Sequence, residues 1–418
     1  MSLELEMAAL GRAAQDAGAQ LRLADEAARN AALRAMAKHV RLETKNILAA
    51  NDADMKAAAE KGLSAPLLDR LKLDADRIEG VAQGLEAIAA LPDPIGTVES
   101  EWTQPNGLHF SKVRVPLGVI GMIYESRPNV TADAGGLCVK SGNACVLRGG
   151  SESLRSNRAL HTALQAGLRE AGLPETAINL VPTTDRAAVG HMLDGLNATI
   201  DLIIPRGGKS LVSRVQKDAR VPVLAHEDGL NHSYVHNSAD IPLAVNVIEN
   251  AKLRRTSVCG STETVLVDED IAAKFLPALE KAIGGKCELR ADKNAMSHLK
   301  SAIQATSKDF DTEHLAPILN IAIVKNIDAA LSHIEKYGSG HTDAILAQDD
   351  EAAKVFLNRV DSAIVLHNAS TQYADGGEFG FGAEIGIATG RIHARGPVGA
   401  QHLTSYKYQV RGTGQVRS

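Results

Sequence analysis

The 418-residue sequence lacks several features that would assign its class at once. It has only four cysteines, and they are too scattered for a zinc site or a disulfide framework. Its 45 basic residues are outnumbered by 50 acidic ones, which leaves a net charge of −5. No basic excess therefore exists to neutralise the phosphates of a nucleic acid or of an anionic membrane. We expect a protein of a reducing cytoplasm, without a nucleic-acid partner, a membrane partner or a metal.

Long hydrophobic segments are also missing. The longest apolar run, 115–124, contains a proline and two glycines and is far too short to span a bilayer. The N-terminal residues are acidic and lack the layout of a signal peptide. No repeat of fixed period and no low-complexity tract occurs. With 44% hydrophobic and 23% charged residues, a chain of this length predicts a globular protein of two or more domains.

Common nucleotide and hydrolase motifs are absent as well: there is no G-x-G-x-x-G fingerprint, no Walker A sequence and no G-x-S-x-G elbow. Two glycine-bearing turns, 148–152 and 205–208, do follow predicted strands, each with an arginine at its entrance. Such turns bind phosphate at helix N-termini, although one alone is more often merely structural. Together they favour a dinucleotide site, in which Arg148 could pair with the 2′-phosphate that distinguishes NADP from NAD.

The order of hydrophobic patterns predicts the architecture. Residues 3–90 are alanine-rich and helical in pattern, whereas 118–225 alternate between apolar strands and helices. The alternation resumes after Cys259, so parallel sheets with helices on both faces are expected. A turn signal at 104–107 and the alternation at 112–115 predict an exposed β-ribbon. The tail, 404–412, could pair with that ribbon, and such ribbons often pack on another subunit.

The central candidate for chemistry is Cys259. A helical pattern over 240–253 and a buried strand at 263–267 enclose a non-helical turn with this cysteine near its middle. Nearby Arg254 and Arg255, with exposed backbone N–H groups, favour the thiolate, which is the nucleophilic form. The alternative is a small buried hydrophobe, the role expected of the other three cysteines: Cys138, Cys145 and Cys287. For His333 and His341, which flank a glycine loop, structural hydrogen bonding is favoured over a metal or acid–base pair.

Several stretches together resemble one family. The most specific is 324–345, supported by four shorter stretches: 124–131, 139–143, 205–210 and 378–385. They resemble the gamma-glutamyl phosphate reductases (glutamate-5-semialdehyde dehydrogenases) of the aldehyde dehydrogenase superfamily. The resemblance implies an α/β fold of two doubly wound βαβ domains with a cleft between them and a small oligomerisation ribbon. The implied bounds are 1–107 and 118–236 for the cofactor-binding domain, 237–368 for the catalytic domain, and 108–117 with 385–418 for the ribbon and tail.

The resemblance also implies roles for particular residues. Cys259 falls at the position of the nucleophile, and Asn129 is the candidate for holding the oxyanion, with Arg127 competing for that place. The expected cofactor contacts are Arg148, Gly149, Pro205, Arg206, Gly207, Gly208 and Glu313. The expected substrate contacts are Arg127, Arg254 and Arg255. Aldehyde-oxidising relatives carry a water-activating glutamate where this chain has His226, with Glu227 one place away, so hydrolysis of a thioester is expected to be slow.

The implied activity is NADPH-dependent reduction of L-glutamyl 5-phosphate to L-glutamate 5-semialdehyde, through a thioester on Cys259, in proline biosynthesis. The implied partners are a second copy of the chain and, transiently, glutamate 5-kinase. Two alternatives stay open at this point. One is an aldehyde-oxidising dehydrogenase that uses Glu227 as its base. The other is a non-catalytic, nucleotide-binding oligomer in which Cys259 is merely buried.

Overall fold

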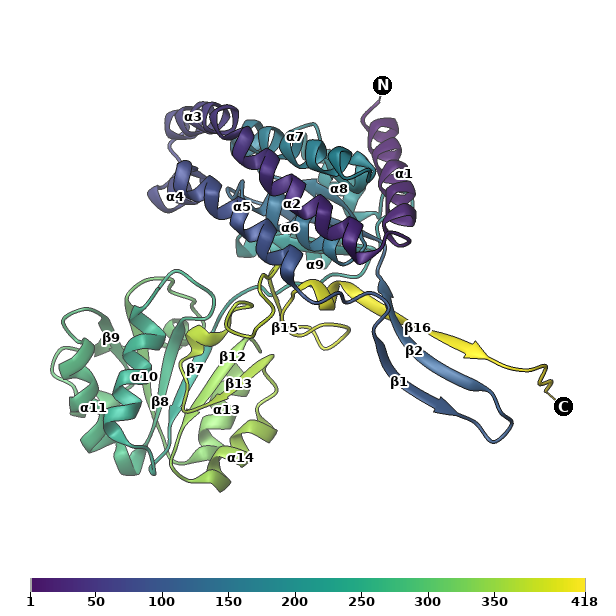
Figure 1. Ribbon diagram of the computed structural model, residues 1–418. Helices are drawn as coiled ribbons and strands as arrows, with labels where there is room; N and C mark the ends of the chain where they lie inside the picture. Colours follow the sequence, from purple (N-terminus) through teal and green to yellow (C-terminus); the bar gives the residue numbers. More distant parts are fainter. Residues whose placement is uncertain (1, 418) are drawn as a thin grey trace. The chain divides into compact units, whose positions relative to one another are not determined.

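The structure is a computed structural model that describes residues 2–417. The chain divides into two compact units (Figure 1). The first contains the residues up to Ala225, together with Gly380–Gly386 and the residues from Val398 onward. The second contains His226–Phe379 and Ile387–Pro397. Among the helices of residues 2–417, none combines the length and apolar character needed to cross a membrane.

The first unit begins with a layer of helices, as the alanine-rich pattern predicts. Leu33, Met36 and Val40 are fully buried on one face of the second helix. Asp25 caps that helix by accepting a hydrogen bond from the Ala28 backbone N–H at 2.7 Å, which satisfies one of its free N-terminal donors. The helices of this layer are α1 (Leu3–Leu21), α2 (Glu26–Leu42), α3 (Thr44–Glu60), α4 (Ala65–Leu71) and α5 (Ala75–Ala90).

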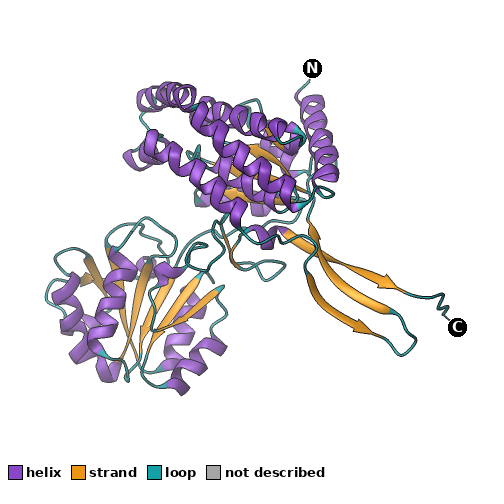
Figure 2. Ribbon diagram, in the orientation of Figure 1, coloured by secondary structure: helices purple, strands orange, loops and turns teal. Residues whose placement is uncertain are grey.

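A four-stranded parallel sheet forms the centre of the first unit, in the order β5-β4-β3-β6. Its strands are almost entirely buried, as expected for a sheet covered by helices on both faces (Figure 2). The strands are β3 (Val119–Tyr124), β4 (Ala144–Arg148), β5 (Ile178–Leu180) and β6 (Leu202–Arg206). The connecting helices are α6 (Val130–Lys140), η1 (Ser151–Ser153), α7 (Leu154–Glu170), η2 (Glu175–Ala177), α8 (Ala187–Leu193) and α9 (Lys209–Asp218).

A separate antiparallel sheet of three strands belongs to the same unit. Its strands are β1 (Val98–Thr103), β2 (His109–Pro116) and β16 (Thr404–Arg411), and η5 (Ala400–Leu403) precedes the last of them. Strand β16 pairs with β2 along its whole length, from Thr404 opposite Pro116 to Arg411 opposite His109. The predicted ribbon and its pairing with the tail are thus confirmed.

The second unit is built on a seven-stranded parallel sheet in the order β10-β9-β11-β8-β7-β12-β13, with a two-stranded antiparallel pair, β14 and β15. The strands are β7 (Asn231–Val235), β8 (Thr262–Asp268), β9 (Glu288–Ala291), β10 (Ile303–Gln304), β11 (Ile318–Val324), β12 (Thr342–Leu346), β13 (Ile364–His367), β14 (Ile387–Ala388) and β15 (Gly396–Pro397). The helices are α10 (Ile241–Leu253), α11 (Glu269–Ile283), η3 (Ala295–His298), α12 (Ser307–Phe310), α13 (Ile327–Tyr337), α14 (Asp350–Arg359) and η4 (Thr371–Tyr373).

Two parallel sheets within βαβ units were predicted and are present, but some boundaries differ from the predicted ones. The predicted cofactor-binding domain extends to 236, whereas β7 pairs with β8 and β12 in the second sheet. The unit boundary therefore follows Ala225. Likewise, 387–397 joins the second unit although the predicted tail begins at 385. Sequence periodicity identifies a buried strand without specifying the sheet in which it pairs, which explains both differences.

Candidate active site

Cys259 lies in the loop between α10 and β8. The helix starts after Asp240, whose side chain accepts a hydrogen bond from the Leu243 backbone N–H at 2.9 Å. Cys259 is half-buried, whereas the other three cysteines are buried in the core, as predicted. The only partly exposed thiol of the described chain is therefore the one on the helix-to-strand loop.

The first residue of β7 and the segment before it are held closely against the Cys259 backbone. The Asn231 side-chain amide donates to the Cys259 carbonyl at 2.6 Å and to the Ser261 carbonyl at 2.9 Å. Its own oxygen accepts from the Thr342 backbone N–H at 3.1 Å. At Gly229, an added Cβ would lie 2.1 Å from the Cys259 carbonyl oxygen. Only glycine fits there, so the approach of these two backbones fixes the position of the cysteine.

The N-terminal half of the loop is held by Gln372, from η4. Its amide nitrogen donates to the Ala251 carbonyl at 3.0 Å and to the Arg255 carbonyl at 3.1 Å. Its amide oxygen accepts from the Arg254 guanidinium at 3.4 Å. Both arginine side chains are exposed, so each can supply positive charge beside the loop.

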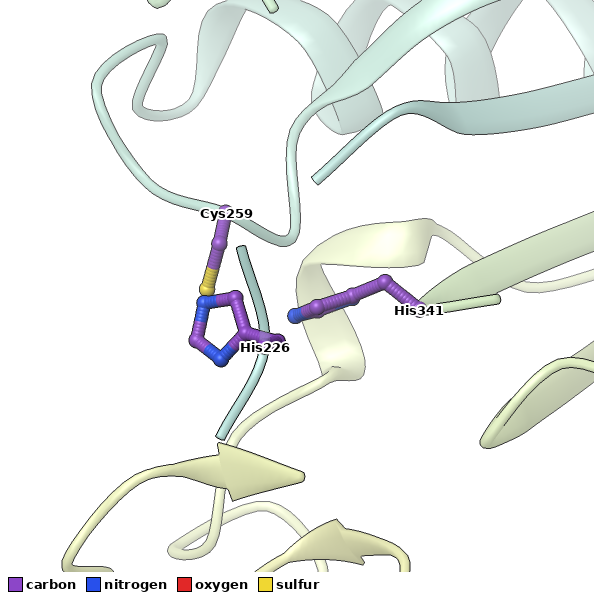
Figure 3. A group of neighbouring side chains, drawn as sticks. All are labelled: His226, Cys259 and His341. Atoms are coloured by element: carbon purple, nitrogen blue, oxygen red, sulfur yellow. The ribbon is translucent and has the colours of Figure 1, made fainter. Parts of the chain in front are cut away.

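Two imidazoles lie beside the Cys259 thiol, as Figure 3 shows. The potential ligand atoms of His226, Cys259 and His341 all lie within 4.8 Å of one another. The two imidazole rings meet edge to face, with their centroids 5.0 Å apart. The Ile387 carbonyl lies 2.7 Å from His226 Nδ1. A carbonyl can only accept, so Nδ1 carries a hydrogen and Nε2 of the neutral ring is the nitrogen that can take up a proton. In Figure 3 that side of the ring faces the sulfur.

His341 precedes β12 and is fully buried. Its Nδ1 lies 2.8 Å from the Thr342 hydroxyl oxygen, whereas its Nε2 has no hydrogen-bond partner among the described residues. The structural role predicted for His341 thus accounts for one of its ring nitrogens and not for the other. For His333 the prediction fits no better, because its buried Nε2 also lacks a partner in the described part of the chain and its ring meets Phe310 edge to face, with centroids 5.2 Å apart.

A buried ion pair that the sequence analysis missed joins the two ends of the Cys259 loop. Lys252, in the last turn of α10, lies 2.8 Å from the Glu263 carboxylate at the start of β8, and both side chains are almost completely inaccessible. Burial raises the pKa of Glu263 to about 7, and the Lys252 ammonium opposes that rise. A lysine at a helix end and a glutamate in an apolar strand are the only sequence signals of this pair.

Glu313, predicted to contact the cofactor, lies close to the same loop. Its carboxylate accepts from the Gly229 backbone N–H at 2.9 Å. It is therefore linked through Gly229 to the backbone of Cys259. Glu227, the general base expected if the chain were an aldehyde-oxidising dehydrogenase, is exposed and is not part of the thiol–imidazole cluster.

The other predicted residues belong to the first unit, and two of them follow β4. The Arg148 guanidinium donates to the Gly149 carbonyl at 2.9 Å and to the Thr184 carbonyl at 3.2 Å, and its buried Nε has no partner among the described residues. A Cβ at Gly149 would lie 2.0 Å from the Asn157 side chain, so this turn also requires glycine.

The turn Pro205–Gly208 joins β6 to α9, and Gly208 caps the helix. The Gly208 backbone N–H donates to the Glu125 carboxylate at 2.9 Å. The N-terminus of α9 thus already binds an anionic group. A diphosphate site requires the same preference for negative charge.

The predicted oxyanion residue precedes α6. The Asn129 amide donates to the carboxylate of the half-buried Asp133 at 2.8 Å. Burial raises the pKa of Asp133 to about 6, against the effect of this hydrogen bond. Arg127, its competitor, is half-buried two residues earlier.

A partly exposed thiol beside two imidazoles is the arrangement expected of an enzyme with a cysteine nucleophile. Comparison with known proteins agrees with that class. The profile of the aldehyde dehydrogenase family matches residues 6–285. The gamma-glutamyl phosphate reductase of Caulobacter vibrioides is 59% identical over 98% of this chain and 100% of the relative. The enzyme of that name from Rhodospirillum rubrum is 58% identical over 98% of this chain and 96% of the relative.

Solved structures agree with the sequence relatives. The crystal structure of gamma-glutamyl phosphate reductase from Thermotoga maritima has a TM-score of 0.97 and 42% identity, covering 100% of both chains. The chain belongs to the aldehyde dehydrogenase family and, within it, to the gamma-glutamyl phosphate reductases. The resemblance and the fold class inferred from the sequence are thereby confirmed.

Proposed function

We propose that this chain reduces L-glutamyl 5-phosphate to L-glutamate 5-semialdehyde and phosphate, with NADPH as reductant, in proline biosynthesis. The observation that carries the proposal is the half-buried Cys259 thiol held beside His226. Membership in a family whose relatives carry the name of this activity supports the choice of substrate.

In the first step, the Cys259 sulfur attacks the acyl-phosphate carbonyl. The S–C bond forms, the C–O bond to phosphate breaks, and the thiol proton passes to His226 Nε2 and then to the departing phosphate. The hydrogen bond from Nδ1 to the Ile387 carbonyl places the hydrogen of the neutral ring on Nδ1, so the proton-accepting lone pair is that of Nε2. Phosphate is a good leaving group, so the step needs no strong general acid.

The tetrahedral oxyanion requires hydrogen-bond donors. The Cys259 backbone N–H and the Asn129 amide are the proposed donors, and Asp133 holds the Asn129 amide in one orientation. Loss of one such donor typically costs roughly 3–4 kcal/mol of barrier. The exposed Arg254 and Arg255, together with Arg127, are proposed to offset the negative charge of the substrate.

The cofactor, when bound, supplies the hydride that reduces the thioester. The Pro205–Gly208 turn would hold its diphosphate, because the Gly208 backbone N–H at that helix N-terminus already donates to a carboxylate. Arg148 is proposed to pair with the 2′-phosphate, beside Gly149, and Glu313 to hold the ribose of the nicotinamide. After reduction, the C–S bond breaks, the aldehyde leaves, and the Cys259 thiolate takes up a proton from solvent.

The alternative oxidising function is disfavoured by the position of Glu227. Its side chain is exposed and does not join the cluster around the thiol. An oxidising enzyme needs a base that activates water against the thioester, and the residue nearest the sulfur in this segment is instead His226.

We also propose that the chain forms a homo-oligomer through the three-stranded sheet. Trp102, Tyr406, Tyr408 and Val410 are between 37% and 55% exposed on its strands. Trp102 stacks on Phe110 with ring centroids 5.3 Å apart and meets Tyr408 edge to face at 6.0 Å, so these rings form one aromatic cluster on the sheet. Exposed apolar surfaces of this kind mark protein–protein interfaces.

The test is oxidation of glutamate semialdehyde by the purified chain, measured with NADP and with or without phosphate. We expect turnover that depends on phosphate and yields the acyl phosphate. Cys259→Ser should abolish it, whereas Cys287→Ser, a change at a buried cysteine outside the site, should retain it. Steady conversion to the free acid without phosphate would instead support the oxidising function, and near-normal turnover by Cys259→Ser would remove Cys259 from the nucleophile role.

A further inference from the structure

One thiol and two imidazoles, which are soft or borderline metal ligands, lie close together although they come from distant parts of the sequence. His226 precedes β7, Cys259 precedes β8 and His341 precedes β12, so each lies just before a strand of one parallel sheet. Their ligand atoms lie within 4.8 Å of one another, and no other such group of three or more His, Cys, Asp or Glu side chains occurs in residues 2–417. Figure 3 shows both imidazoles directed toward the sulfur.

Both imidazoles are oriented by their second nitrogen. His226 Nδ1 donates to the Ile387 carbonyl at 2.7 Å, and His341 Nδ1 lies 2.8 Å from the Thr342 hydroxyl. Metal-binding histidines characteristically use one ring nitrogen in this way, which fixes the ring and directs the other nitrogen toward the ion.

The unpartnered nitrogen of His341 is the second, independent observation. His341 is fully buried, and its Nε2 lacks a hydrogen-bond partner among the described residues. Buried polar atoms are nearly always satisfied, so such an atom requires an explanation. Nε2 of His232 and of His333 is unsatisfied in the same way, but those two rings meet each other edge to face, with centroids 5.5 Å apart, and no thiol belongs to their cluster. The His341 nitrogen alone faces a set of metal ligands.

We propose that His226, Cys259 and His341 form a reversible, inhibitory site for a thiophilic divalent cation, with Zn²⁺ as the best fit. Zinc binds cysteine sulfur at about 2.3 Å and histidine nitrogen at about 2.0–2.1 Å, which places tetrahedral ligand atoms roughly 3.5 Å apart. The side chains must therefore close by roughly 1 Å from the limit of 4.8 Å. The half-exposed cysteine gives the ion a route of entry, and water fills the fourth position.

Binding of the ion blocks the proposed chemistry. The Cys259 S–H bond breaks, the proton leaves to solvent, and the sulfur donates one lone pair to the metal. The metal then withdraws the thiolate charge and occupies the space beside the sulfur, so the sulfur no longer attacks the carbonyl. The cluster contains no carboxylate, so Mg²⁺ and Ca²⁺, which prefer oxygen ligands, should not bind. Inhibition rests on the proposed function, whereas metal binding does not.

The experiment measures metal binding directly and inhibition separately. The reduced, EDTA-treated full chain is titrated with Co²⁺ under inert gas, and the thiolate-to-cobalt charge-transfer band is followed. Zn²⁺ is then added to displace the cobalt. We expect one equivalent of Co²⁺ to produce the band and Zn²⁺ to remove it. Cys259→Ser should abolish the band. His226→Ala and His341→Ala should each weaken Co²⁺ binding by at least about 100-fold, because loss of even an outer partner of a ligand costs roughly 10–100-fold.

His333→Ala is the matched control, since it removes a half-buried imidazole whose buried Nε2 is unpartnered and lies outside the cluster, and it should bind Co²⁺ like the unmodified chain. With acyl phosphate as substrate, the Zn²⁺ concentration that halves the rate should rise by the same factor in His341→Ala as its Co²⁺ affinity falls, and EDTA should restore the rate. The metal site is overturned if the purified chain reduces acyl phosphate but gives no cobalt charge-transfer band. It is also overturned if the band persists in His226→Ala and in His341→Ala. A band without any acyl-phosphate reduction in the metal-free chain overturns the proposed function and leaves the metal site standing.

Discussion

Gly229→Ala is the sharpest test of the geometry around the nucleophile. An added Cβ would lie 2.1 Å from the Cys259 carbonyl oxygen, 2.8 Å from its carbonyl carbon and 2.9 Å from its Cα. All three atoms are backbone, so no side chain can rotate away to make room. One of the two segments must shift by roughly 1 Å to restore an ordinary contact. Overpacking of this kind typically costs about 1–3 kcal/mol of unfolding free energy.

The same shift should damage activity more than stability. It moves Cys259 and disturbs two hydrogen bonds, from Gly229 to the Glu313 carboxylate and from Asn231 to the Cys259 carbonyl. A misplacement of about 1 Å can cost on the order of 100-fold in rate. We therefore expect kcat/KM for acyl-phosphate reduction to fall by about 100-fold or more, while the loss of unfolding free energy stays near 1–3 kcal/mol.

The assay compares Gly229→Ala with Gly285→Ala. Gly285 belongs to the same unit, and a Cβ there would meet no atom within 4 Å. Steady-state kinetics, urea unfolding and the rate of iodoacetamide reaction with the Cys259 thiol are measured for both. Gly285→Ala should match the unmodified chain in all three. If Gly229→Ala does so as well, the close approach of the two backbones is not what positions the cysteine.

Three further predictions concern other parts of the chain. Because burial raises the pKa of Glu263 from 4.5 to about 7, the folded state retains a proton that the unfolded state has lost between those values. The unfolding free energy should then fall by roughly 3 kcal/mol as the pH rises through that range, and Glu263→Gln should flatten the slope in urea titrations. Arg148→Leu should raise KM for NADPH far more than KM for NADH, and equal effects would exclude a role in reading the 2′-phosphate. Trp102→Lys should shift the chain to smaller species in analytical ultracentrifugation without changing its unfolding midpoint, and an unchanged mass would argue against an interface on the three-stranded sheet.

The kinds of elements, and Cys259 as the candidate nucleophile, can be predicted from the order of residues along the chain. Apolar strands alternating with helices predict parallel sheets because strands buried on both faces have a recognisable composition, and the structure contains two such sheets. The loop between α10 and β8 was predicted from a helical pattern and a buried strand on either side of Cys259, both of which depend on local order along the chain.

The residues that surround Cys259 come from distant parts of the chain, and their meeting depends on how the strands pair and pack. Strands β7, β8 and β12 are parallel neighbours, so the residues just before them lie together at the amino-terminal ends of these strands. His226, Cys259 and His341 therefore meet although they are far apart in sequence. The buried pair of Lys252 and Glu263 likewise depends on how α10 packs against β8. Strand order and packing are set by the burial of many side chains at once, and periodicity along the chain does not record them.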